Sequence, residues 1–282
     1  MTPPQRLFTS LPSFLAASRG ERDGALQGLL ACLGPDFVPG VDPRRDRNGE
    51  TVDYGLPRVH HQPTGVCFVV VPGGTFEMGL SETDVDRAMA LVDWTPEVAR
   101  FVEQLKSRAR PLREVLVEPF LCAVEPLLVP QVAAWTNGGH ARDTFTAPDA
   151  ERWVTLRPGF RLPSEAELEY LARDGVQQSF IYDGARTFDD GIWPEQGRFG
   201  VRRLTDNEWT ADEWHDDYTG APPTSAPWRT GDGPPAFRGL SPDPPEVNTA
   251  LVLTLASARG KPIAADRNLC ARPVFPLGSL LS

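Results

Sequence analysis

Apolar residues recur at helical spacing in two segments of the chain. One set lies on a single helix face, and Gly34 and Pro35 predict the end of this helix: Leu26, Leu29, Leu30 and Leu33. The other set starts after Thr95 and Pro96, where proline suits the first helical position: Val98, Phe101, Val102 and Leu105. A shorter helix is expected from Ser81, with Asp84 completing a capping box. Such stripes are typical of helices that pack on a core.

Continuous apolar runs predict buried strands. They read "VCFVVVPGG" (66–74), "REVLVEPFLCAV" (113–124), "ALVLTLASARG" (250–260) and "CARPVFPL" (270–277). The segment "PQVAAW" (130–135) predicts a short helix, and residues 136–150 predict a loop. Residues 176–250 are dominated by Gly, Pro, Asp, Asn and Trp, and long irregular segments of this kind usually carry function.

The segment "RLPSEAELEYLARDG" (161–175) contains every signal of a complete helix. Ser164 and Glu167 form a capping box, and acidic residues in the first turn complement the helix dipole. Glu169 and Arg173 have the favourable i, i+4 order, and Gly175 can close the last turn. We therefore interpret the acids as structural in preference to catalytic.

Composition narrows the class of protein. The chain has 282 residues, 40% of them hydrophobic, and a net charge of −10, which argues against nucleic-acid or anionic-membrane partners. Pro 29 and Gly 25 indicate a loop-rich fold. The four cysteines form no close pair, so a reducing compartment is expected. With a poor signal-peptide pattern and no long apolar run, the sequence favours a cytoplasmic protein.

Five ordered segments resemble one known family. They are "VVVPGGTFEMG" (69–79), "RLPSEAELEYLARDG" (161–175), "NEWTADEWHDDY" (207–218), "AFRGLS" (236–241) and "SARG" (257–260). Together they resemble the formylglycine-generating enzyme (sulfatase-modifying factor) family, which includes the C-terminal domain of ergothioneine-type sulfoxide synthases. The resemblance implies a loop-rich α+β, C-type-lectin-like fold over residues 61–282, often supported by calcium. Residues 1–60 would then be an N-terminal helical extension and loop, and the helices at 81–110 an addition.

The chain departs from the family at its metal positions. The two cysteines that bind copper in the family fall near Pro244 and Thr249, and neither side chain can ligate Cu(I). The sulfoxide synthases take three histidines from a separate helical domain. Here the histidines are His60, His61, His140 and His215, without i, i+4 spacing, so a redox metal is not expected. Cys270, beside Arg272, is interpreted as a packed thiol.

Two sets of candidate site residues follow from the resemblance. The family's substrate groove predicts a ligand surface made of Trp209, Trp214, Trp228, Arg238, Arg259 and Arg272. Arg259 and Arg272 are equally consistent with bracing loops through buried hydrogen bonds. The acidic segment 206–217 offers oxygen ligands for calcium, with Asn207 and Asp212 as candidates, although a solvated acidic loop is the simpler interpretation.

The sequence therefore supports two functions of different classes. The first is a non-catalytic binding or assembly protein whose arginines accept a carboxylate-bearing peptide or small molecule, with a protein partner as a further expectation. The second is a metal-dependent (iron or copper) oxidoreductase acting on a sulfur compound or peptide. Bound iron and copper in the purified protein would discriminate between them.

Overall fold

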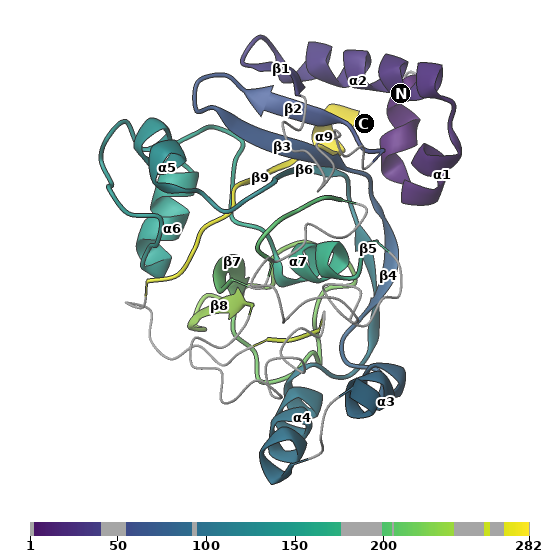
Figure 1. Cartoon of the computed structure of the whole chain (residues 1–282), viewed down its shortest axis with the longest axis vertical. Coiled ribbons are helices and arrows are strands. Elements are labelled where there is room, and N and C mark those ends of the chain that lie inside the picture. Colours follow the sequence, from purple (N-terminus) through teal and green to yellow (C-terminus); the bar gives the residue numbers. More distant parts are fainter. Residues whose placement is uncertain are drawn as a thin grey trace.

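A five-stranded antiparallel sheet forms one end of the molecule (Figure 1). The computed structural model describes residues 3–40, 55–91, 95–175, 199–204, 206–239, 257–259 and 268–281. The sheet has the order β1 (Phe37–Gly40), β2 (Arg58–His61), β3 (Val66–Val71), β6 (Phe120–Ala123) and β9 (Val274–Pro276). The apolar run predicted at 66–74 forms the central strand β3. Its Phe68 pairs with Val59 of β2, and its Val70 pairs with Leu121 of β6.

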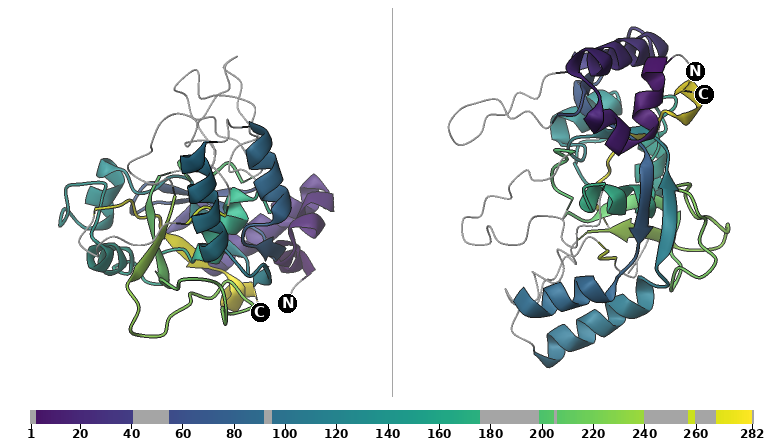
Figure 2. Two further views of the ribbon diagram at one scale, coloured as in Figure 1. Left: turned by 90° about the horizontal axis from the view of Figure 1, so that it is seen from below. Right: turned by 90° about the vertical axis from the view of Figure 1, so that its right-hand side faces the viewer.

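The N-terminal segment packs at one edge of this sheet. It comprises η1 (Pro3–Thr9), α1 (Leu11–Ala16) and α2 (Arg19–Leu33), and α2 contacts β1 and the C-terminal helix α9 (Gly278–Leu281). The two chain ends accordingly lie close together (Figure 2). Gly34 ends α2 with a φ of 85°, as its position after the leucine stripe predicts. The domain boundary expected at residue 60 falls inside β2.

A two-stranded ribbon carries two helices away from the sheet. The ribbon pairs β4 (Gly74–Met78) with β5 (Arg113–Val117), and α3 (Glu82–Leu91) and α4 (Pro96–Arg108) lie side by side at its far end (Figure 2). Both helices confirm the predicted starts, because Ser81 and Asp84 exchange capping hydrogen bonds and Thr95 caps α4. The apolar stripe of α4 is buried at Val98, Val102 and Leu105.

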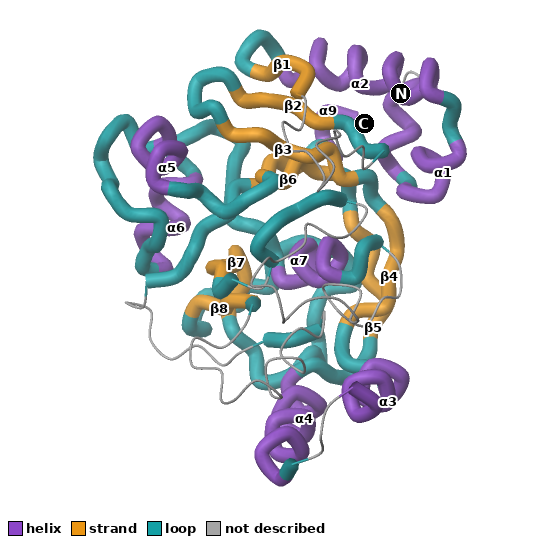
Figure 3. The backbone as a smooth tube through the Cα atoms, viewed as in Figure 1, coloured by secondary structure: helices purple, strands orange, loops and turns teal. Residues whose placement is uncertain are grey.

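Helix α7 (Glu165–Ala172) lies at the centre of the chain's loop-rich half (Figure 3). It contacts β4, β5, β7 (Glu208–Glu213) and β8 (Pro235–Arg238), and β7 and β8 form a short antiparallel ribbon of their own. Helices α5 (Val129–Trp135) and α6 (Ala147–Val154) lie on the side of β7 away from β4 (Figure 1). The described chain is thus a mixed α+β structure with antiparallel sheets.

One prediction from the sequence differs from the structure, and another falls mostly outside the described residues. The loop expected at 136–150 is wrong from Ala147 onward, because Thr146 caps α6 and a proline occupies its first turn. Most of the strand expected at 250–260 lies outside the described residues; within them, Arg259 makes one bridge to Arg238. None of the described helices is long and apolar enough to cross a membrane.

Two capping boxes allow a matched test of the α7 start. Ser18 on exposed α2 and Ser164 on buried α7 each exchange hydrogen bonds with a glutamate three residues later. Ser18→Ala should lower the free energy of unfolding by about 0.5–1 kcal/mol. Ser164→Ala should lower it by about 1–2 kcal/mol, because the freed Glu167 N–H has no access to water. Urea denaturation measures both values; equal effects would mean that burial of the cap adds nothing.

Candidate functional site

Helix α7 is buried on every face, including its acidic residues. Glu165, Glu167 and Glu169 are 3%, 1% and 0% exposed, although a surface helix would turn such residues to water. An ionised carboxylate in a protein interior is stable only when it is paired and hydrogen-bonded. The partners of these glutamates therefore decide how the surrounding segments are arranged.

Glu167 is held at the start of the helix. Its carboxylate accepts the Ser164 N–H at 2.8 Å and both terminal nitrogens of Arg161 at 2.7 and 2.6 Å. This two-bond geometry is the strong form of an arginine–carboxylate contact. Arg161 and Glu167 thus fix the approach of the chain to α7.

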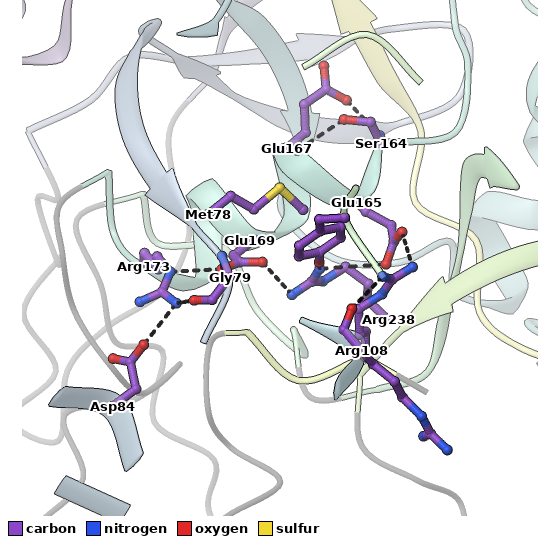
Figure 4. A network of polar contacts seen from close by, with 12 residues as sticks. Met78, Gly79, Asp84, Arg108, Ser164, Glu165, Glu167, Glu169, Arg173 and Arg238 are labelled. Atoms are coloured by element: carbon purple, nitrogen blue, oxygen red, sulfur yellow. Dashed lines mark hydrogen bonds and ion pairs between the residues drawn. The ribbon is translucent and has the colours of Figure 1, made fainter. Parts of the chain in front are cut away.

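Glu169 connects α7 to three other segments (Figure 4). It accepts hydrogen bonds from the Gly79 N–H after β4 at 2.8 Å, from Arg173 at 2.9 Å and from Arg238 of β8 at 2.9 Å. Arg173 continues to Asp84 of α3 at 3.2 Å. One carboxylate therefore joins the β4 turn, β8 and, through Arg173, helix α3.

Glu165 binds the arginines of two marker segments. Arg259 donates to it at 2.8 Å, and Arg238 lies 3.6 Å from it. The Arg259 guanidinium lies over the rings of Trp214 and Tyr218, 4.3 and 4.6 Å from their centroids, and also donates to the Arg108 carbonyl. Burial raises the pKa of Tyr218 to about 12 despite the two arginines beside it. This cluster is closely packed and neutralised by its own acids.

Another buried ion pair lies at Glu208, the first residue of β7. Arg272 donates to both carboxylate oxygens of Glu208 at 2.8 and 2.7 Å, and to the carbonyls of Ala123 and Arg202. Burial, with Glu208 adding to it, raises the pKa of the nearby Cys270 thiol to about 12, so this thiol stays protonated at neutral pH.

The predicted tryptophans lie in different surroundings. Trp209 is buried and donates to the Phe145 carbonyl at 2.8 Å, whereas Trp214 donates to Asp216 at 3.1 Å. Trp228 is partly buried and stacks on His215 with ring centroids 3.5 Å apart. The structure brings Trp214, Arg238 and Arg259 together around Glu165 and holds Arg272 in its own ion pair with Glu208. Their role in ligand binding stays a prediction.

The two calcium candidates are held by different neighbours. Asp212 Oδ1 and Oδ2 accept the N–H groups of Trp228 and Glu165, both at 2.8 Å. Asn207 precedes β7 and its backbone contacts Cys270, while its buried Oδ1 has no hydrogen-bond partner among the described residues. The two residues thus have separate surroundings, and their role as calcium ligands stays a prediction.

A cavity of about 270 Å³ opens between α6 and β7. Its wall combines apolar residues with charged ones: Ala147, Pro148, Glu151, Leu162, Trp209, Thr210, Ala211, Asp212, Glu213, Arg229, Gly233 and Pro235. The sequence singled out Trp209 and Asp212 but missed Glu151, which forms an ion pair of 2.7 Å with Arg229. Glu151 belongs to α6, the helix that the sequence pattern did not predict; its signals are the Thr146–Pro148 start and the helical spacing of the buried Ala147, Ala150 and Val154.

Comparison with known proteins supports the fold alone. No protein-family profile and no curated protein sequence matches this chain. Its structure is similar to that of PvdO from Pseudomonas aeruginosa, with 19% identity and a TM-score of 0.58 over 76% of this chain and 95% of PvdO. It is also similar to Treponema denticola variable protein 1, with 12% identity and a TM-score of 0.50 over 86% of this chain and 100% of the other. PvdO has a formylglycine-generating-enzyme-like fold, so the likeness supports that fold here.

The buried position of Arg238 predicts a large effect on stability. Arg238→Ala would remove an ion-pair partner of Glu169 and the positive charge that lies 3.6 Å from Glu165. Breaking a buried ion pair lowers the free energy of unfolding by about 3–5 kcal/mol. The control is Arg19→Ala, which removes an exposed pair with Asp23 and should cost at most about 0.5 kcal/mol. Urea denaturation of the two variants tests this difference. An Arg238→Ala variant as stable as Arg19→Ala would contradict a bracing role.

Asp212 predicts a dependence of stability on pH. Burial, with the Glu165 charge beside it, raises the pKa of Asp212 to about 7, whereas an unfolded aspartate titrates near about 4. Between these values the folded state holds more protons, so the Asp212 contribution to the free energy of unfolding falls as pH rises. The stability of the wild type relative to Asp212→Asn should therefore decrease from pH 4.5 to pH 8. Denaturation of the wild type and Asp212→Asn at both pH values measures this decrease. Asp149→Asn, on the surface of α6, is the matched control variant.

Proposed function

We propose that this chain is a non-catalytic binding protein of the formylglycine-generating-enzyme-like, C-type-lectin-like fold. The observation that carries the proposal is the loss of the copper ligands at Pro244 and Thr249, while the marker segments around α7 are retained. Proline offers no donor atom and a threonine hydroxyl is a hard ligand, so neither replaces a thiolate for Cu(I).

The described part of the chain supports a structural role for the retained markers. Arg238 and Arg259 contact glutamates of α7 and are buried, so a bracing role explains why both arginines belong to the marker segments. The fold then presents recessed surfaces, of which the cavity between α6 and β7 contains both aromatic and charged groups. Such a mixture is typical of ligand sites.

The carboxylate-bearing ligand expected from the sequence stays a prediction. A ligand carboxylate at Arg238 or Arg259 would compete with Glu165 or Glu169, which already occupy these guanidinium groups. If a ligand carboxylate replaced one of these glutamates at its arginine, the glutamate would stay buried and charged without that ion-pair partner. The competing oxidoreductase function has no specific support among the described residues, where no group of three His, Cys, Asp or Glu side chains gathers as metal ligands do.

The metal content of the purified protein tests the proposal. Protein produced in metal-supplemented medium, and again after reconstitution with Cu(I) and Fe(II), should contain iron and copper well below one atom per chain. Elemental analysis after gel filtration measures the content. One copper or iron atom per chain would overturn the proposal and favour a metal-dependent oxidoreductase.

A further inference from the structure

Asp212 differs from the other buried carboxylates of the described chain. The others each have an arginine within ion-pair distance: Asp84, Glu165, Glu167, Glu169 and Glu208. Asp212 is only 7% exposed and accepts two backbone N–H groups, yet it makes no ion pair within the described residues. A buried carboxylate without a counter-ion is costly, and such groups mark functional sites more often than structural ones.

Asp212 is one of the residues that line the cavity between α6 and β7. The charged groups at the cavity are Asp212, Glu151, Glu213 and one cation, Arg229, whose guanidinium is already bound to Glu151 and to the Ala211 carbonyl. Glu213 is likewise occupied, because it accepts hydrogen bonds from Thr230 and Gly231. The cavity therefore carries excess negative charge: neither Asp212 nor Glu213 forms an ion pair among the described residues, and Asp212 is the buried one of the two.

We propose that this cavity binds the primary ammonium group of a ligand, with Asp212 as the counter-ion. The inference rests on the proposed binding function and deepens it by naming the site and the ligand chemistry. Trp209, Leu162 and Pro148 provide an apolar wall for a short alkyl chain that carries the ammonium group.

The hydrogen bonds of Asp212 leave acceptor sites for an ammonium donor. A carboxylate has about four lone-pair sites, and one on each oxygen is used by a backbone N–H. An ammonium group needs one of the remaining sites, whereas a bidentate guanidinium needs one on each oxygen in a fixed geometry.

The electrostatics of the site support a cationic ligand. Burial and the Glu165 charge raise the pKa of Asp212 to about 7, so a neighbouring cation would lower this pKa and release a proton near neutral pH. The charged groups that act on Asp212 come from α7, the segment before it, β5 and the cavity wall: Glu165, Glu167, Arg161, Arg113, Glu151, Glu213 and Arg229.

Isothermal titration calorimetry with butylammonium tests the proposal on the full chain. Butylammonium copies the end of a lysine side chain and stays cationic up to about pH 10, and 1-butanol is its neutral counterpart. Butylammonium should bind with one site per chain, at least tenfold more tightly than 1-butanol. Its affinity should weaken towards tenfold per pH unit below about pH 6, because Asp212 must lose its proton to bind. Nα-acetyl-lysine-N-methylamide, tested in parallel, should bind more tightly than butylammonium if the natural ligand is a peptide lysine, and no more tightly if it is a free amine.

Asp212→Asn should weaken butylammonium binding at least tenfold, whereas Asp149→Asn, outside the cavity, should leave it unchanged. If Asp212→Asn does not fold, the pH dependence and the 1-butanol comparison on the wild type decide the matter. Absence of butylammonium binding, equal binding of 1-butanol, or binding of Ca²⁺ in its place would overturn the inference. This failure is distinct from that of the proposed function, which depends on iron and copper content.

Discussion

The need to neutralise buried carboxylates on α7 organises the centre of this protein. A helix with three buried glutamates cannot fold in isolation, because each charge would lose its hydration without compensation. The arginines that compensate them come from before α7, from its C-terminus, from β8 and from the segment at 257–259. Segments with little regular structure are thereby fixed by ion pairs where a sheet would use backbone hydrogen bonds. This explains how a loop-rich chain keeps a defined interior.

Local signals in the sequence predicted much of the secondary structure. The leucine stripe of α2, the capping boxes at Ser81 and Ser164 and the apolar run of β3 act over a few residues, and the structure confirms each of them. Helix α6 was missed because the loop expected at 136–150 covers its capped start, although Ala147, Ala150 and Val154 have helical spacing. The strands β7 and β8 lie in a stretch whose composition predicts irregular structure, and their pairing depends on tertiary contacts.

The candidate site was less predictable, because it depends on contacts between distant segments. The pattern of α7 explained its acids as capping, helix-dipole and i, i+4 ion-pair groups, but periodicity cannot show that every face of a helix is covered. Arg238 and Glu169 are far apart in the sequence and meet only in the fold. The same limit applies to Asp212: the sequence places it in an acidic stretch, and only the structure shows that it alone among the buried described acids lacks an ion pair. The fold itself was expected from the five marker segments, although the identity to PvdO is only 19%.

The link from Asp84 through Arg173 to Glu169 bears on how this protein could be shortened. Helices α3 and α4 extend from one end of the molecule and resemble an insertion that a protein engineer would remove to obtain a minimal scaffold (Figure 1). Deletion of the pair would take away Asp84 and the Arg108 carbonyl, leaving two fully buried guanidinium groups short of an acceptor. A minimal scaffold would therefore need compensating substitutions at Arg173 and Arg259. In this protein the added helices have become part of the interior that they adjoin.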